Sequence, residues 1–113
     1  MDCIFCKIAN KEIPSGIVYE DDDVIAFNDL NPEAPVHILV IPKKHIVNLN
    51  DAKPEDQQLL GKLMLTIQKI AAEQGIAESG YRVVTNCGEQ GGQTVMHMHF
   101  HLLGGREMLW PAG

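Results

Sequence analysis

The chain has 113 residues, of which 45% are hydrophobic and 21% charged, and its formal net charge is −6. This length suits one domain over residues 1–113 with a modest core. The acidic balance disfavours binding along a nucleic acid, which needs basic patches, although N–H groups and histidines can still neutralise a single phosphate. No apolar run reaches the length of a membrane span, so no membrane partner is expected.

The N-terminus is acidic at Asp2 and carries the pair Cys3-x-x-Cys6. This start is unlike a signal peptide, and three cysteines, an odd number, do not suit a disulfide framework, so we expect a cytoplasmic protein. Three interpretations of the cysteine pair stay open: a redox pair, half of a zinc site, or two structural thiols. We expect a short helix to continue over residues 7–13, where a Pro-Ser-Gly stretch follows.

Two strands joined by a turn are expected next, at residues 17–20 and 24–27. In the proline-containing loop that follows, Asp29 is placed to accept hydrogen bonds from sugar hydroxyls, although turn capping is the commoner role for such an aspartate. Residues 36–42 form the most apolar run, which predicts a central strand. His37 interrupts this run, and a histidine there is more often a satisfied core group than a catalyst.

Leucine, methionine and isoleucine recur at three- and four-residue spacing across residues 54–75, which predicts one long helix. Pro54 suits its first turn and Gly75 its C-terminal stop. Residues 81–86 predict another strand. The glycine-rich segment 87–94 lacks the Gly-Lys-Ser/Thr of a Walker loop, yet its three glycines allow backbone N–H groups to approach an anion.

Residues 95–103 alternate histidine with apolar residues, and His97, His99 and His101 are three of the five histidines in the chain. Strict alternation predicts a β-strand with the three imidazoles on one face and apolar side chains on the other. Alternate residues lie about 6.6 Å apart along a strand, close enough to share a ligand or pass a proton. A lone histidine on a strand is usually just a polar surface residue, but three in register beside a glycine-rich loop favour chemistry.

The sequence of residues 97–103, His-Met-His-Phe-His-Leu-Leu, resembles the His-φ-His-φ-His-φ-φ motif of the histidine triad (HIT) superfamily. His101 separates the chain from the galactose-1-phosphate uridylyltransferase branch, which has Gln at that position, and the zinc finger of the aprataxin branch has no counterpart. The resemblance covers nearly the whole chain. It is closest to the Hint branch, the histidine triad nucleotide-binding proteins, at Glu12-Ile13-Pro14, at residues 40–45, at residues 91–94 and at residues 110–113.

The resemblance implies an α+β fold with a five-stranded antiparallel sheet, one long helix and a short N-terminal helix, paired into a ten-stranded sheet in a homodimer. It implies binding of purine nucleoside monophosphates and hydrolysis of the P–N bond of nucleoside 5′-phosphoramidates. His99 would be the nucleophile that forms a nucleotidyl-histidine. His101 would stabilise negative charge on the phosphate, and His37 would orient His99 or relay a proton.

Further site residues are implied in the same way. Thr94, where more familiar members have Ser, and the backbone of Gly92 and Gln93 would hold phosphate oxygens or the leaving group. Trp110 would approach from the partner subunit and influence substrate choice. The ribose and phosphate would also contact Asp29, Leu30 and Asn86. No cofactor is implied for the reaction itself, but some members bind structural zinc through the positions that are here Cys3, Cys6, His45 and His97.

Two other functions stay open. One is a non-catalytic nucleotide-sensing or scaffold protein, although the intact His99 and Thr94 argue against it. The other is a dinucleoside polyphosphate hydrolase of the Fhit type, although the C-terminal Trp-Pro-x-Gly sequence favours the Hint branch.

Overall fold

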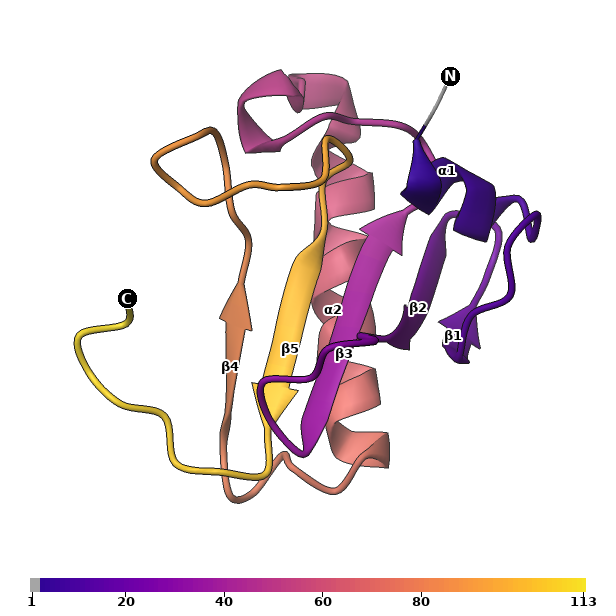
Figure 1. Ribbon diagram of the computed structural model, residues 1–113. Helices are drawn as coiled ribbons and strands as arrows, with labels where there is room; N and C mark the ends of the chain where they lie inside the picture. The colour runs from indigo at the N-terminus through magenta and orange to yellow at the C-terminus, as the bar shows by residue number, and fades with distance from the viewer. Residues whose placement is uncertain (1–2) are drawn as a thin grey trace.

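A five-stranded antiparallel sheet forms the centre of the structure, a computed structural model that describes residues 3–113. Its strands lie side by side in the order β1-β2-β3-β5-β4 (Figure 1). The sheet and the helices on it confirm the predicted α+β class. The strands are β1 (Ile17–Glu20), β2 (Val24–Asn28), β3 (Val36–Pro42), β4 (Tyr81–Val84) and β5 (Phe100–Gly104).

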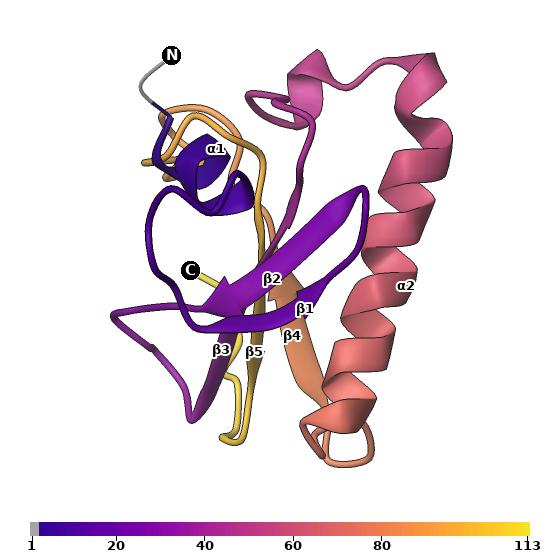
Figure 2. The ribbon, with the colours of Figure 1, turned by 90° about the vertical axis from the view of Figure 1, so that its right-hand side faces the viewer.

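Helices cover the two faces of this sheet unequally (Figure 2). α2 (Gln57–Glu73) lies along one face, where its buried Leu63, Ile67 and Ile70 pack with side chains of β2, β3 and β5. The short α1 (Ile4–Ala9) lies on the opposite face, over β2 and β3. No helix among the described residues has the length and apolarity needed to cross a membrane. The acidic start at Asp2 is outside the described residues.

The long helix forms where the sequence predicts it. A 3₁₀ turn at Pro54–Asp56 leads directly into α2. Gly75, which has a φ of 75°, follows the last turn, and Ile76 N donates to Ala71 O at 3.1 Å. Glycine adopts this left-handed conformation without strain, which is why the helix stops there.

The strand that carries the histidine motif begins later than predicted. The sequence suggested a strand from residue 95, but β5 begins at Phe100, which lies opposite Val40 of β3. β3 ends at Pro42, which has no N–H to continue the ladder. The carbonyl of Pro42 instead lies 2.8 Å from His97 Nε2, and Met98 N donates to Ile46 O beyond the end of β3.

The predicted alternation between two faces nevertheless holds. On the α1 side, the rings of His97 and His99 lie against Phe5, and the ring of His101 lies against that of His99. The residues between the histidines are buried on the α2 side, in a cluster that includes Met98, Phe100 and Leu102. The period of two therefore survives outside the hydrogen-bonded part of the strand.

The N-terminal helix begins earlier than predicted, at Ile4 rather than residue 7, and it ends at Ala9. Cys3 is its N-cap, because its sulfur accepts a hydrogen bond from Cys6 N at 3.3 Å. The cysteine pair is thus part of the helix and does not merely precede it. A helix of six residues is too short to be stable alone, so α1 depends on its contacts with the sheet.

Replacement of Leu63 by Ala should lower the free energy of unfolding by about 2–5 kcal/mol, because the side chain is fully buried between α2 and the sheet. Leu65→Ala is the matched control on the same helix. Leu65 is 67% exposed, so its loss should cost about 0.5 kcal/mol or less. Urea denaturation followed by circular dichroism measures both changes, and similar losses in the two variants would contradict the packing described here.

Candidate active site

Four side chains of types that can bind a metal ion meet where α1 faces the end of β3. One donor atom each from Cys3, Cys6, His45 and His97 lies within 4.8 Å of every other. Cys6 Sγ is 3.2 Å from His45 Nδ1, Cys3 Sγ is 3.3 Å from His97 Nδ1, and the two Nδ1 atoms are 3.2 Å apart. A tetrahedral zinc site, with Zn–S of about 2.3 Å and Zn–N of about 2.0–2.1 Å, has edges of about 3.3–3.8 Å. The distances between the predicted donor atoms therefore fit a zinc ion held by two cysteines and two histidines.

The protonation states of His97 and Cys6 bear on whether the cluster can hold a cation. His97 Nε2 donates to the carbonyl of Pro42, so Nδ1 keeps its lone pair. Burial lowers the pKa of His97 and favours its neutral form. The nearby His45 and His99 lower this pKa further, and the hydrogen bond to Pro42 opposes them. Burial and the neighbouring Cys3 raise the pKa of the Cys6 thiol to about 11. A metal ion would supply the positive charge that a thiolate needs here.

His99 is held in one orientation by the backbone just before it. Its Nδ1 lies 2.7 Å from the carbonyl oxygen of His97. A carbonyl can only accept a hydrogen bond, so the proton sits on Nδ1 and Nε2 keeps its lone pair. The ring is buried, and the ring of Phe5 meets it edge-on at a centroid distance of 5.0 Å. A fixed imidazole with an unprotonated Nε2 is the form that attacks an electrophile.

A chain of hydrogen bonds sets the protons of the other two imidazoles. Glu33 N donates to His37 Nδ1 at 3.0 Å, so neutral His37 carries its proton on Nε2. That Nε2 lies 2.9 Å from His101 Nδ1 and 3.4 Å from Asp29 Oδ2. His101 therefore accepts at Nδ1 and presents an N–H at Nε2. His37 was expected to orient His99 or relay a proton. Its hydrogen bond is to His101, whose ring lies beside that of His99, and the relay role stays a prediction.

His101 is neutral at pH 7. Burial, followed by the charges of His99 and His37, lowers its pKa to about 4. It therefore offers a phosphate an N–H dipole rather than a full positive charge. Asp29, His37 and His101 also lie within 4.8 Å of one another. Because the His37 Nε2 proton points into this group, it suits a shared-proton network better than a metal ion.

A pocket of about 260 Å³ lies between α1, β2 and the loop that follows β2. Asp29 and Leu30, which the sequence analysis singled out, line it, and so does Ser15, whose hydroxyl has no hydrogen-bond partner among residues 3–113. The sequence analysis missed the apolar wall. Its only signal was the helical spacing of Phe5 and Ile8, which does not distinguish a pocket wall from a core. The wall consists of Ile4, Phe5, Ile8, Ile13, Phe27 and Leu39.

The glycine-rich loop is braced from inside by Gln93. This side chain is buried, and its amide bonds to Val47, Asn48, Gly88 and Val95. The backbone N–H groups of Gly92 and Gln93 donate to carbonyls within the loop. Asn86 Nδ2 also donates into it, to Gly91 O at 2.7 Å. This conformation does not favour the predicted contact between those two N–H groups and a phosphate, whereas Thr94 is exposed.

The C-terminal segment runs outside β4 (Figure 1). Trp110 is 83% exposed, and its ring centroid lies 5.8 Å from the guanidinium carbon of Arg82. Arg82 also donates to Leu109 O at 2.9 Å, which ties the segment to β4. A single copy of the protein thus brings together Asp29 and the imidazoles of His37, His99 and His101. It does not bring Trp110 to them.

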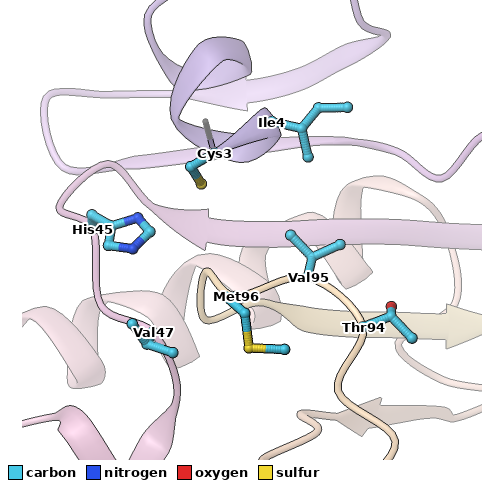
Figure 3. A pocket seen from close by; sticks show the side chains of 7 residues that line it. All are labelled: Cys3, Ile4, His45, Val47, Thr94, Val95 and Met96. Atoms are coloured by element: carbon cyan, nitrogen blue, oxygen red, sulfur yellow. The ribbon is translucent and has the colours of Figure 1, made fainter. Parts of the chain in front are cut away.

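A second pocket, of about 400 Å³, opens beside the metal-binding side chains (Figure 3). Cys3 and His45 line one side of it, and Thr94 and Met96 line the other. Ile4 lines both this pocket and the 260 Å³ pocket, so α1 stands between the two. Two of the four residues of the cluster, Cys3 and His45, therefore line a pocket at the surface, whereas His97 is fully buried.

The HIT domain family matches residues 10–108 of the chain, a span that contains every histidine described above. The chain belongs to the HIT family. It is 51% identical over 107 residues to the purine nucleoside phosphoramidase of Escherichia coli, covering 95% of this chain and 90% of that protein. It is 60% identical to an uncharacterized HIT-like protein of Synechococcus elongatus, covering 99% of this chain and 97% of that protein.

Solved structures of other HIT proteins have the same fold. A HIT family hydrolase from Legionella pneumophila superposes with a TM-score of 0.98 at 50% identity, covering 99% of this chain and all of that one. A histidine triad protein from Clostridium difficile superposes with a TM-score of 0.94 at 55% identity, covering 96% and 95% of the two chains. Together with the HIT match, these similarities confirm the family resemblance seen in the sequence.

The free energy of unfolding should fall as the pH drops from about 6.5 towards about 4. The unfolded chain takes up a proton on His101 near the ordinary histidine pKa of 6.5, whereas the folded state resists it until about 4. Protons therefore favour unfolding across this window. Asp21 acts in a separate window, because its hydrogen bonds outweigh its burial and lower its pKa from 3.8 to about 2.

Denaturant titrations at about pH 7 and about pH 5 measure this effect. His101→Asn removes the group and should lose less stability between the two pH values than the parent does. An equal loss in parent and variant would assign the pH dependence to other groups.

Proposed function

We propose that this HIT protein hydrolyses the P–N bond of purine nucleoside 5′-phosphoramidates through a covalent intermediate on His99. The observation that carries the proposal is the 2.7 Å hydrogen bond from His99 Nδ1 to the carbonyl of His97, which leaves Nε2 ready to attack. The relative in Escherichia coli named purine nucleoside phosphoramidase supports the substrate class.

In the proposed reaction, the lone pair of His99 Nε2 forms a bond to the α-phosphorus and the P–N bond breaks. The leaving nitrogen keeps the bonding electrons and takes up a proton from solvent, so a neutral amine departs. Water then attacks the phosphorus, and the bond from the phosphorus to Nε2 breaks with its electrons returning to Nε2. The attacking water loses a proton to solvent, which balances the proton taken up in the first step, and the nucleoside monophosphate departs from a neutral His99. Splitting the displacement into two steps in this way is nucleophilic catalysis.

His101 stabilises the charge that develops during both steps. Its Nε2–H is the free donor at the end of the chain from Glu33 through His37, so it can donate to a non-bridging phosphate oxygen. The neutrality of His101 keeps the proton on that donor from being lost to the phosphate. Thr94 supplies a hydroxyl for a phosphate oxygen or for the leaving group.

We place the nucleoside in the 260 Å³ pocket. Its wall is mostly apolar, which suits the faces of a purine ring, and Phe5 reaches from this wall to the ring of His99. Asp29 lines the same pocket and lies beside His37, where its carboxylate can accept hydrogen bonds from ribose hydroxyls. The nucleoside and the reactive nitrogen are thereby placed side by side.

We propose that two copies pair through β4. The other edge strand, β1, has a register shift between Ile17 and Tyr19, and such bulges oppose further strand pairing. β4 is regular, and its Tyr81 and Val83 are 37% and 38% exposed. A second β4 beside it would produce a ten-stranded sheet. Trp110, exposed beside the same edge, would then lie near the partner subunit.

We also propose that a zinc ion occupies the cluster of Cys3, Cys6, His45 and His97. Its role would be structural, because four protein ligands leave no open position for a reacting water. The donor distances and the hydrogen bond from His97 to Pro42 support this role.

All three cysteines are free thiols, which suits the reducing environment of the cytoplasm.

The parent protein should hydrolyse adenosine 5′-phosphoramidate, and His99→Ala should lower kcat by about three orders of magnitude or more, since it removes the attacking atom. EDTA should not abolish turnover by the parent. Cys87→Ser, which changes a free thiol of the neighbouring loop, is the control and should keep full activity. Steady-state kinetics with circular dichroism as a check of folding measure these effects.

The outcomes separate the alternatives. Full activity in folded His99→Ala would contradict the proposed nucleophile. Binding of AMP without hydrolysis would favour a nucleotide sensor or scaffold. Faster turnover of diadenosine triphosphate than of the phosphoramidate would favour a dinucleoside polyphosphate hydrolase.

The proposed dimer is tested by light scattering. The parent should have twice the chain mass of 12.5 kDa, and Val83→Lys should have the mass of one chain because it places a charge against its own copy. Ile17→Lys is the matched control, since Ile17 is a similarly exposed aliphatic residue on the other edge strand. A dimer that survives Val83→Lys but not Ile17→Lys would place the interface at β1.

A further inference from the structure

Helix α1 takes part in two sites at once. It holds Cys6, and Cys3 is its N-cap, so it brings both sulfur ligands to the metal cluster. The residues between and after the cysteines, Ile4, Phe5 and Ile8, form part of the wall of the 260 Å³ pocket. A six-residue helix thus carries half of the metal ligands and a large share of the apolar wall of the pocket.

The two sites are also in direct contact. The ring of Phe5 meets the imidazole of His97, a metal-binding residue, at a centroid distance of 6.1 Å and the ring of His99 at 5.0 Å. It also packs edge-on against Phe27 at a centroid distance of 5.5 Å, and both rings line the pocket. Any shift of Phe5 therefore changes both the metal cluster and the nucleotide pocket.

Helix α1 packs on β2 and β3, but its contacts with the two histidines of the cluster are weak without a metal. The helix is too short to be stable by itself. Beyond its apolar contacts with β2 and β3, its link to the far side of the cluster consists of the edge-on contact between Phe5 and His97 and of S···N contacts of 3.2–3.5 Å from its two cysteines. Thiols are poor hydrogen-bond donors and acceptors, so these contacts restrain the helix little. Metal–sulfur bonds would tie the same two positions firmly to His45 and His97.

We infer that binding of zinc at Cys3, Cys6, His45 and His97 sets the affinity for the nucleotide, because it fixes the helix that forms the wall of the nucleotide pocket. The inference rests on the proposed nucleotide pocket and adds a coupling between that pocket and the metal. The coupling is reciprocal, since each ligand must strengthen the binding of the other by the same factor.

The 400 Å³ pocket provides the route by which the metal exchanges without unfolding. Cys3 and His45 face it directly (Figure 3). In this route, a chelator or a zinc donor would approach the cluster on the side of Cys3 and His45, while the rest of α1 stays packed on the sheet. This access makes the zinc-loaded and zinc-free forms of the native chain experimentally comparable.

The experiment compares AMP binding by calorimetry to the zinc-loaded protein and to protein stripped with a chelator in the presence of a reductant. The zinc-free form should bind AMP about 5- to 150-fold more weakly, which is the usual span of coupling between two sites. Cys6→Ser, which removes one ligand, should resemble the zinc-free form with or without added Zn²⁺. Cys87→Ser is the matched control and should bind AMP as the parent does.

A second measurement guards against loss of the fold in stripped or mutated protein. In the parent, saturation with AMP should raise the affinity for zinc, measured by equilibrium competition with a chromogenic chelator. The factor should equal the change in AMP affinity that zinc causes. Hydrogen exchange should show faster exchange of the α1 amides in the zinc-free form, with α2 unchanged.

Equal AMP affinity in folded zinc-loaded and zinc-free protein would overturn the inference and leave the proposed function intact. The absence of AMP binding in both forms would overturn the nucleotide pocket and the inference together. A purified chain that binds no Zn²⁺ would remove the coupling while leaving hydrolysis to be judged by its own assay.

Discussion

The hydrogen bond from His99 Nδ1 to the carbonyl of His97 is the interaction on which the site depends. It places the only proton of neutral His99 away from the pocket and leaves Nε2 as the reactive nitrogen. The same residue that accepts this bond through its backbone points its side chain into the metal cluster. One stretch of extended chain therefore orients the proposed nucleophile, His99, and carries a proposed metal ligand, His97, so a shift of one should move the other.

Proton positions elsewhere in the site follow from one backbone donor. Glu33 N–H bonds to His37, which places the His37 proton towards His101 and gives His101 a free N–H on its far side. Burial keeps His101 neutral at physiological pH. In the proposed reaction, the site would therefore stabilise a phosphate with oriented dipoles rather than net charge, which agrees with the formal charge of −6 on the chain.

The Cys/His cluster and the apolar pocket both depend on the position of α1. A sheet covered by a long helix on one face has an open second face, and here a helix of only six residues covers part of it. Such a helix needs anchoring from outside, and both cysteines provide it at the end nearest the histidines. Phe5 and Ile8 of α1 thus belong to a buried cluster with β2 and β3 and also line the pocket.

Several features of the protein could be predicted from local sequence. The alternation of histidines with apolar residues placed the imidazoles on one face, because two-residue periodicity is a property of extended backbone wherever it occurs. The spacing of apolar residues and Gly75 gave the long helix and its end. The His-φ-His-φ-His motif, with its matching stretches elsewhere, indicated the HIT family and named Cys3, Cys6, His45 and His97 as one group.

Other features were decided only by tertiary structure. β5 begins at Phe100 because Pro42, on a different strand, cannot extend the ladder. His37 bonds to His101 because β3 and β5 are neighbours in the sheet, and no spacing along the chain encodes that choice. The apolar wall of the pocket was missed for the same reason. A sequence shows which face of a helix is apolar, but only the packed chain shows whether that face fills a core or surrounds a cavity.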